Sequence, residues 1–328
     1  MGVSMRVLVT GGAGFIGSNF VEMALTDQFP EISSVLVLDK LTYAGKLSNL
    51  SSVAHNPNYE FVQGDICDIE LVNDLAPKVD VIINFAAESH VDRSIENSSE
   101  FIRTNIIGTQ VLLDAAKKHK LKKFLQVSTD EVYGSILEGS WDENEPLLPN
   151  SPYAASKASA DLLVRAYFVT HGLNVNITRC SNNFGPKQDP EKLIPNFILK
   201  LIQDEKVPVY GDGMNVRDWL FVEDHCAGIY LILTKGLPGE IYNIGGGIEL
   251  TNLELTRKLL NLLKKDESQI EYVPDRLGHD RRYSVTYSKI SQLGYSPDKN
   301  FDDNLKLTYE WYLKKFTNYG NQNLEGIQ

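Results

Sequence analysis

The side chains best suited to acid–base chemistry in this sequence are Tyr153 and Lys157. Ser151 and Pro152 precede them and are preferred at the N-cap and first position of a helix, so Tyr153 is expected to begin a helix. A spacing of four residues places both side chains on one helix face. A neighbouring ammonium lowers the pKa of a phenol from its usual value near 10. The pair therefore predicts a tyrosine that can accept a proton near neutral pH.

A second candidate is the adjacent carboxylate pair Asp130 and Glu131, which follows Thr129 and an apolar run at 123–128. The carboxyl ends of strands form the ligand crevice of open α/β sheets. Two carboxylates there can take separated pKa values and act as an acid and a base. The alternative interpretation is a loop pair held by backbone N–H groups.

Three glycines indicate a phosphate-binding turn. Gly11, Gly14 and Gly17 follow a strand-like run at 6–10 and open a helical pattern at 16–26. Glycines allow the backbone to approach a pyrophosphate at a helix N-terminus, where N–H groups and the helix dipole favour anions. In this context the spacing predicts a dinucleotide site rather than a turn needed for packing alone.

Acidic residues after the next two strands indicate which dinucleotide binds. Asp39 lies 22 residues beyond Gly17, where a carboxylate accepts hydrogen bonds from ribose hydroxyls and repels a 2′-phosphate. This favours NAD over NADP, although Lys40 weakens the preference slightly. The positive nicotinamide ring would add to the effect of Lys157 on Tyr153. Asp65 either reaches the adenine edge or is a plain turn residue.

The elements that must position these residues alternate along the first part of the chain. Strands are predicted at 6–10, 35–39, 59–63, 79–85, 123–128 and 175–179, and helices at 16–26, 70–76, 99–118 and 152–171. The strands are continuously apolar, as expected when helices cover both faces of a parallel sheet. The fold class is therefore predicted to be α/β, a doubly wound parallel sheet of the Rossmann type.

After about residue 180 the pattern is broken by prolines and glycines, with helices predicted at 194–204, 223–235, 252–265 and 302–316. We expect an NAD-binding domain with the catalytic residues at 1–180. Residues 181–328 are expected to form mainly a smaller, mixed α/β lobe for the substrate. Segments near 218–245 are expected to return to the first domain.

Composition argues against several classes of function. The 328 residues carry a net charge of −11 with pI ≈ 5.1, which disfavours nucleic-acid binding. The run Lys117–Lys123 is therefore better explained as a helix end followed by a solvated loop. We expect no membrane segment and no signal peptide, since apolar runs are short. Three scattered cysteines form no disulfide or zinc pattern, so a cytoplasmic location is expected.

Glu88, His90 and Asp92 could together form a metal site. Their odd spacing would place the three side chains on one side of an extended segment. One histidine with two carboxylates is a weak ligand set, so we expect no metal.

Taken together, the motifs resemble the extended short-chain dehydrogenase/reductase family, and within it the dTDP-glucose 4,6-dehydratases. The resemblance covers Val7 to about Trp311 and is carried by segments 39–45, 86–94, 129–131, 153–157, 181–183, 190–195 and 217–219. Relatives that epimerise at C4 usually lack the Asp-Glu pair after the threonine. The family's Asp-Arg-Pro-Gly-His segment is present here with Leu277 in place of proline.

The resemblance implies dehydration of dTDP-glucose to its 4-keto-6-deoxy product by internal redox with bound NAD. Tyr153, with Lys157 and Thr129, would serve C4 oxidation, while Glu131 would take the C5 proton and Asp130 would protonate the C6 hydroxyl. The expected partners are this nucleotide sugar and a second copy of the chain, through the helices at 99–118 and 152–171. Another nucleotide-sugar 4,6-dehydratase or a C4 epimerase, and more remotely a non-catalytic NAD-sensing protein, are the alternatives.

Two sets of binding residues follow from the glycine motif and the resemblance. The expected cofactor-binding residues are Gly11, Gly14, Phe15, Ile16, Gly17, Asp39, Lys40, Thr42, Asp65, Ile66, Ala86, Ala87, Ser89, Thr104, Tyr153, Lys157 and Asn183. The expected substrate-binding residues are Ser89, Thr129, Asn182, Lys192, Leu193, Pro208, Tyr210, Arg217, Asn252, Arg276 and His279. Arg217 is the best diphosphate partner, because a guanidinium binds phosphate bidentately; the alternative is an exposed surface arginine.

Overall fold

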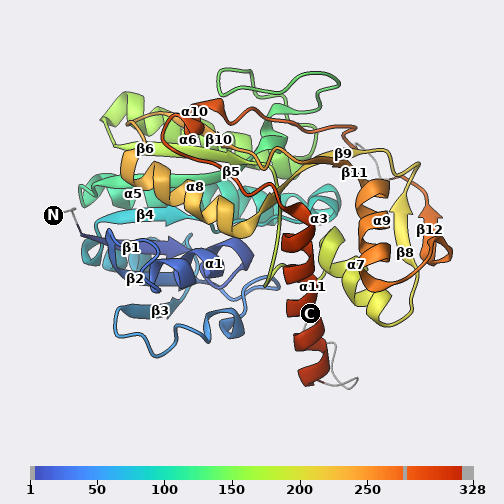
Figure 1. Cartoon of the computed structure of the whole chain (residues 1–328). Helices are drawn as coiled ribbons and strands as arrows, with labels where there is room; N and C mark the ends of the chain where they lie inside the picture. Colours follow the sequence, from blue (N-terminus) through green and yellow to red (C-terminus); the bar gives the residue numbers. More distant parts are fainter. Residues whose placement is uncertain (1–3, 276–278, 320–328) are drawn as a thin grey trace.

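Seven parallel strands form the centre of the protein. The computed structural model describes residues 4–275 and 279–319 (Figure 1). The strand order is β10-β6-β5-β4-β1-β2-β3, and every neighbouring pair is parallel. The six predicted strands are confirmed, and β10 is an additional seventh. Their bounds are β1 Met5–Thr10, β2 Ile32–Asp39, β3 Tyr59–Gln63, β4 Val81–Asn84, β5 Lys123–Thr129, β6 Val175–Cys180 and β10 Ile241–Ile244.

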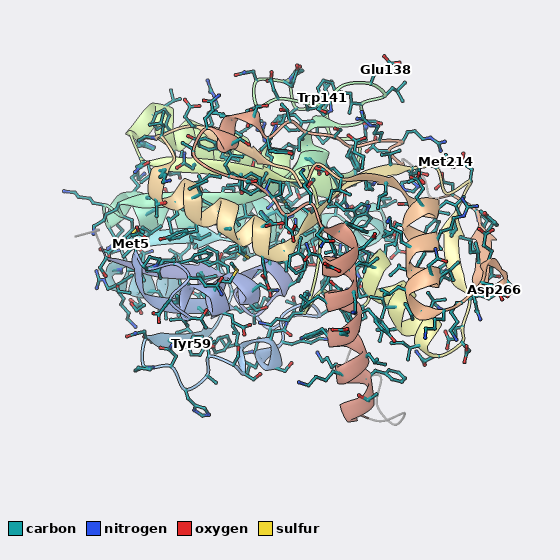
Figure 2. The ribbon with its side chains drawn as sticks, viewed as in Figure 1. Met5, Tyr59, Glu138, Trp141, Met214 and Asp266 are labelled. Carbon is teal, nitrogen blue, oxygen red and sulfur yellow. The ribbon has the colours of Figure 1, made fainter. Side chains whose placement is uncertain are left out.

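Helices cover both faces of this sheet, which explains the continuous apolarity of its strands. In β1, Val7 and Val9 belong to the core that includes side chains of α1 (Phe15–Ala24) and α8 (Val222–Lys235). Leu8 points to the opposite face and joins the core formed with α2 (Ile69–Leu75), α5 (Thr109–Lys118) and α6 (Pro152–His171). Figure 2 shows how side chains fill the space between these layers.

Helix α6 has the predicted bounds because both of its ends are marked in the sequence. The Ser151 side chain accepts a hydrogen bond from the N–H of Ala154 at 3.1 Å, and Pro152 occupies the first position. Gly172 ends the helix in the left-handed conformation with φ +67°. The helix therefore holds Tyr153 in its first turn, as expected.

The helix predicted at 99–118 is interrupted. It consists of α4 (Ser99–Phe101), a π-helical segment η3 (Ile102–Gly108) and α5. Within η3, the Asn105 side chain bonds to the backbone of Glu88 at 2.9 and 3.0 Å and to the Ser156 hydroxyl at 2.8 Å. The wide turn therefore ties together the loop after β4 and helix α6, an arrangement often found at functional sites.

Residues after 180 add smaller sheets and further helices. A mixed sheet has the order β11-β9-β7, and a parallel pair joins β12 to β8. The bounds are β7 Asn182–Phe184, β8 Val207–Tyr210, β9 Val216–Phe221, β11 Glu249–Thr251, β12 Ile270–Val273, α7 Leu193–Ile202, α9 Asn252–Leu263 and α11 Phe301–Tyr319. Strand β10 lies in the large sheet beside β6, while the division into two domains stays a prediction.

Short elements complete the described chain, and one lysine differs from expectation. The remaining elements are η1 Leu47–Leu50, η2 Ala76–Lys78, α3 Val91–Glu96, η4 Asp130–Tyr133, η5 Glu267–Gln269 and α10 Ser288–Ser291.

Lys123 is buried in β5 rather than solvated, and its ammonium donates to the carbonyls of Ile232, Leu233 and Gly236 at 3.0–3.2 Å. The expected solvated loop is therefore wrong at this position, because Lys123 caps the end of α8.

The long loop between η4 and α6 is attached to a distant part of the chain. Figure 2 labels Glu138 and Trp141 on the long loop between η4 and α6. The backbone N–H of Trp141 donates to the Ser284 carbonyl at 2.9 Å, so this loop is fastened to the chain that follows β12. No helix in the ranges 4–275 and 279–319 is both long enough and apolar enough to span a membrane.

Candidate active site

A cavity of about 310 Å³ opens at the carboxyl ends of β1, β2, β3, β4, β5 and β6. At one end it is lined by the glycine turn after β1, and at the other by Tyr153 and the turn η4. Lys192, at the start of α7, closes one side. This is the position at which open α/β sheets bind their ligands.

The glycine turn has the close packing that a dinucleotide site requires. Gly11 has φ +67°, and a Cβ there would lie 2.7 Å from the N atom of Ala86. A Cβ on Gly17 would lie 2.4 Å from the Gly11 carbonyl oxygen. Larger residues would therefore push the first turn of α1 away from the strands and close the approach for a pyrophosphate. The turn fits NAD.

Asp39 lies at the end of β2 and lines the same cavity. One carboxylate oxygen accepts a hydrogen bond from the Ala13 N–H at 2.9 Å and the other from the Leu41 N–H at 2.8 Å. Burial nevertheless raises the pKa of Asp39. Because a carboxylate offers about four acceptor positions, the side chain can still accept bonds from ribose hydroxyls.

The sequence offers two interpretations of Asp65, as a residue that reaches the adenine edge or as a plain turn residue, and its position is compatible with both. It lines the cavity, and it also shapes its own turn by accepting the Cys67 N–H at 2.9 Å. The Lys40 ammonium lies 3.0 Å from its carboxylate. Burial would raise the pKa of Asp65, but these hydrogen bonds and the Lys40 charge lower it overall. Asp65 is therefore ionised at the wall of the cavity.

Tyr153 and Lys157 both line the cavity, but the shift in the tyrosine pKa is opposite to the expected one. Burial, followed by the charges of Glu131 and Asp130, raises the pKa of Tyr153 well above its usual value, while a hydrogen bond with Thr129 lowers it. The Lys157 ammonium donates to the Val127 carbonyl at 2.7 Å. Burial and the neighbouring negative charges therefore determine the direction of the shift in the Tyr153 pKa.

The carboxylates of η4 have different surroundings, as the acid–base hypothesis requires. Asp130 is 3% exposed, and its Oδ2 atom has no hydrogen-bond partner within the described part of the chain. Burial, with the charges of Glu131 and Asp218, raises its pKa well above the usual value. Glu131 is less buried and also lines the cavity. Asp130 is therefore suited to hold a proton.

The structure brings most predicted site residues together. The five expected catalytic residues and all seventeen expected cofactor-binding residues line this one cavity, as do Ser89, Thr129, Asn182 and Lys192 from the substrate set. The roles assigned to them stay predictions. Arg276 and its neighbour Leu277 lie outside the described residues.

The other expected substrate residues do not line the cavity; they lie on α7, β8, β9 and α9 and in the chain that follows β12. These are Leu193, Pro208, Tyr210, Arg217, Asn252 and His279. The alternative of an exposed Arg217 is wrong: it is 5% exposed and lies 4.4 Å from the centre of the Tyr283 ring. Its guanidinium donates to the Val216 and Asp280 carbonyls and lowers the pKa of Asp130 through its charge.

Several cavity residues were missed by the sequence reasoning. They are Leu38, Ala44, Gly45, Gly64, Phe85, Glu88, Val127, Ser128, Cys180, Ser181, Gln188 and Asp189. Most are direct neighbours of predicted residues, so proximity in the chain could have found them. The sequence singles out Glu88 only as part of a possible metal site. The extended segment assumed there is wrong from residue 91 onward, where α3 begins.

Comparison with known proteins shows to which family this chain belongs. The family model for GDP-mannose 4,6 dehydratase matches residues 8–308. A dTDP-glucose 4,6-dehydratase from an Actinoplanes species is 55% identical over 94% of this chain and 98% of its own. The chain belongs to the dTDP-glucose 4,6-dehydratase family.

Two other relatives also match nearly the whole length of this chain. DesIV, a dTDP-glucose 4,6-dehydratase from Streptomyces venezuelae solved with NAD and TYD bound, has a TM-score of 0.95 and 52% identity. The alignment covers 99% of this chain and 100% of DesIV. The low-salt glycan biosynthesis protein Agl12 of Haloferax volcanii is 55% identical over 94% of this chain and 99% of its own.

Proposed function

We propose that this protein is an NAD-dependent hydro-lyase that converts dTDP-glucose to dTDP-4-keto-6-deoxyglucose. The observation that carries the proposal is the convergence of the Tyr153–Lys157 pair and the Asp130–Glu131 pair on one cavity with the glycine turn. Membership of the family supports it. An NAD-sensing protein would have no need for an acid and a base beside the dinucleotide site.

The residues that would hold NAD come from the ends of several strands. The glycine turn would hold the pyrophosphate, and Asp39 the adenosine ribose. Tyr153, Lys157 and Asn183 line the opposite end of the cavity. When bound, NAD would accept a hydride from C4 and return it to C6, and its cationic ring would lower the pKa of Tyr153.

Tyr153 would take the proton of the C4 hydroxyl. Its hydrogen bond with Thr129 orients the phenol toward the carboxylate pair, and Lys157 is fixed one helical turn away. To act as this base, Tyr153 must first lose its own proton. Its partly buried position beside carboxylates opposes that loss unless a compensating positive charge is present. Proton transfer at C4 is therefore expected only when NAD is bound in the cavity.

The carboxylate pair would then eliminate water. A ketone at C4 acidifies the C5–H bond, and Glu131 takes that proton. The C5–C6 double bond forms while the C6–O bond breaks, and Asp130 gives its proton to the departing hydroxyl. When C6 then takes up the hydride, C5 is reprotonated, for which the proton held by Glu131 is available, and Asp130 regains a proton before the next turnover. The raised pKa of Asp130 supports this assignment, since a leaving group needs an acid that is protonated before the step.

The nucleotide sugar would extend from this cavity toward the lobe. Lys192 donates to the Ser89 carbonyl at 3.0 Å, so the two residues form a fixed edge of the cavity. The buried guanidinium of Arg217 supports a role in holding the diphosphate from the lobe side.

A substrate panel tests the proposed function. The purified protein is incubated separately with dTDP-glucose, UDP-glucose and GDP-mannose, and each product is analysed by mass spectrometry. Loss of one water from dTDP-glucose, giving a 4-keto-6-deoxy sugar, is expected. A product of unchanged mass with inverted C4 would instead support the epimerase alternative, which the Asp130–Glu131 pair disfavours.

We also infer that the protein acts as a homodimer in the cytoplasm. Exposed apolar side chains lie on η3 and α6: Ile102, Ile107, Leu162 and Val169 are 47–64% exposed. Such a patch favours burial against a second copy. Light scattering should give twice the chain mass of 36.8 kDa, and Leu162→Asp should give the monomer mass. Leu237→Asp, at an exposed leucine elsewhere, is the control, and a monomeric parent would contradict the inference.

A further inference from the structure

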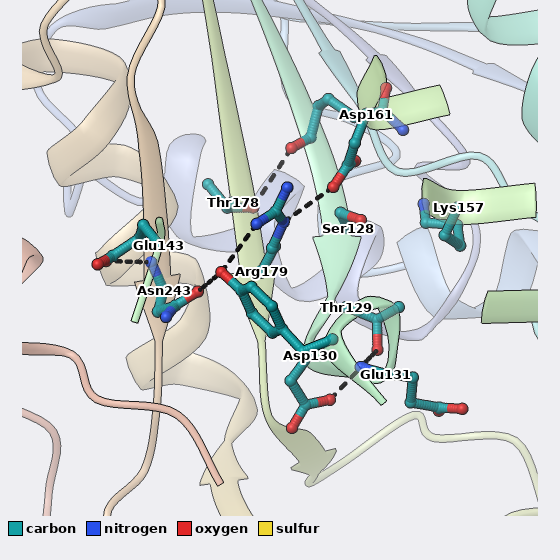
Figure 3. A network of polar contacts seen from close by, with 12 residues as sticks. Ser128, Thr129, Asp130, Glu131, Glu143, Lys157, Asp161, Thr178, Arg179 and Asn243 are labelled. Atoms are coloured by element: carbon teal, nitrogen blue, oxygen red, sulfur yellow. Dashed lines mark hydrogen bonds and ion pairs between the residues drawn. The ribbon is translucent and has the colours of Figure 1, made fainter. Parts of the chain in front are cut away.

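We propose that Tyr133 is a positioning residue for water elimination, because its buried hydroxyl holds the turn that carries Asp130 and Glu131. This inference rests on the proposed function. It assigns a role to side chains behind the cavity that do not line it. Figure 3 shows the polar contacts on which it depends.

The geometry of η4 joins Tyr133 to the carboxylates. Asp130–Tyr133 form a single 3₁₀ turn, in which side chains three residues apart lie one above the other. The side chains of Asp130 and Tyr133 are therefore on the same face of the turn. A rotation of the turn that moved the Tyr133 hydroxyl would move the Asp130 carboxyl with it.

The Tyr133 hydroxyl is held from two sides. It donates to Asn243 Oδ1 at 2.9 Å and accepts from Arg179 Nη1 at 2.8 Å. Tyr133 is 1% exposed, and the Arg179 guanidinium also lies over its ring at 4.7 Å. Burial raises the pKa of this hydroxyl to about 12, so it stays neutral and keeps both its donor and its acceptor role.

The partners of Tyr133 are themselves fixed by the sheet. Arg179 of β6 is paired with Ser128 of β5 on one side and with Asn243 of β10 on the other. Neighbouring positions in parallel strands point to the same face, so Arg179 and Asn243 reach Tyr133 together. The Asn243 amide also donates to the Trp141 carbonyl at 3.2 Å.

The same hydrogen-bond network extends to α6, the helix that carries Tyr153, the proposed base for C4 oxidation. Arg179 donates from Nε to Asp161 at 3.0 Å, and both side chains are buried. Asp161 lies four residues after Lys157 in α6, one helical turn away. The contacts Asp161–Arg179–Tyr133 therefore set the distance between the carboxylates of η4 and the Tyr153–Lys157 pair.

The test compares Tyr133→Phe with Tyr242→Phe. Each variant loses one buried phenolic hydroxyl; that of Tyr242 accepts the Leu237 N–H at 3.0 Å, away from η4. The NAD-loaded variants are mixed with dTDP-glucose, and absorbance at 340 nm reports C4 oxidation. Rapid-quench mass spectrometry follows loss of water. Circular dichroism and thermal melting give the folded fraction of each variant.

For Tyr133→Phe we expect C4 oxidation within about threefold of the parent and water loss slower by about 10–100-fold, as for a catalytic group displaced by a fraction of an ångström. Tyr242→Phe should keep both rates. Asn243→Ala, which removes one partner and keeps Tyr133, should show the same split more weakly and replaces Tyr133→Phe if that variant does not fold.

Two results would overturn the proposal. One is equal slowing of oxidation and water loss in Tyr133→Phe, in proportion to its folded fraction. The other is an unchanged rate of water loss. If the parent itself releases no water from dTDP-glucose, the proposed function has failed, and this outcome is read from the parent alone.

Discussion

Asp130 has surroundings that favour its neutral form in the folded protein. Burial, Glu131 and Asp218 raise its pKa, while the unfolded chain releases this proton above about pH 4. The stability linked to this proton is complete below that pH and is lost as the pH rises through the raised pKa. Elimination should show the same dependence, because the acid must be protonated.

Asp130→Asn should therefore gain thermal stability relative to the parent, and the gain should grow between pH 5 and pH 9. An amide has no proton to release in this range, so the variant escapes the loss suffered by the parent. Melting curves at five pH values measure the difference. Asp212→Asn is the control, because hydrogen bonds from Arg281 lower the pKa of Asp212 to about 2 and its effect should not vary over this range. A constant difference for Asp130→Asn would contradict the raised pKa.

Tyr153 is the residue assigned to C4 oxidation, so Tyr153→Phe should lower turnover by about 10²–10⁴. The ring and its edge-on contact with Phe101 at 6.4 Å should remain, and dTDP should still raise the melting temperature. Turnover and melting with dTDP measure the two effects. Tyr167→Phe removes a hydroxyl from the same helix, where it donates to Asp114 at 2.7 Å, and should stay active. Near-normal turnover of Tyr153→Phe would assign the proton to another group.

The catalytic residues could be predicted from local spacing, whereas their surroundings could not. Tyr153 and Lys157 are four residues apart, and Asp130 follows a strand, so the chain itself carries the signal. The burial of Arg217 and the role proposed for Tyr133 depend on residues far away in the sequence, such as Asp280 and Asn243. Periodicity and motif spacing contain no information on such contacts.

At the scale of elements, α6 illustrates how capping positions a site. Ser151→Ala should lower the free energy of unfolding by about 1 kcal/mol, because the Ala154 N–H loses its acceptor. Chemical denaturation measures this change. Ser159→Ala, in the middle of the same helix, should be neutral or slightly stabilising, since its hydroxyl bonds back to the Ala155 carbonyl. Equal losses in the two variants would exclude a specific capping effect.

Elements were predictable where their ends are marked locally. Helix α6 is bounded by Ser151, Pro152 and Gly172, and the predicted range agrees with the structure. The sequence did not predict the π-helical segment η3 within the helix at 99–118. Its wide turn is held by contacts of Asn105 with Glu88 and Ser156, which no local sequence pattern indicates. Strands β7 and β11 were missed since each has three residues and exists only through pairing with β9.

At the scale of the whole molecule, the cavity joins parts of the chain that are far apart in sequence. Its walls run from Gly11 to Lys192, so a bound dinucleotide would contact the turn after β1, the ends of other strands in the large sheet and the start of α7. Filling the cavity would therefore stabilise the large sheet and the start of α7 together. A ligand that binds only the folded state adds RT ln(1 + [L]/Kd), about 2.7 kcal/mol at 100 times Kd.

The last prediction follows from this coupling and from a redox cycle that closes in each turnover. NAD should co-purify with the protein, since it is regenerated and has no reason to leave. Acid release and chromatography should find close to one nucleotide per chain, and the amount should be the same after many turnovers of dTDP-glucose. Stripped protein should melt at a lower temperature and recover when NAD, but not NADP, is added, because Asp39 repels a 2′-phosphate. A need for stoichiometric added NAD, with its reduced form accumulating as fast as product, would show an open redox reaction and exclude the internal one.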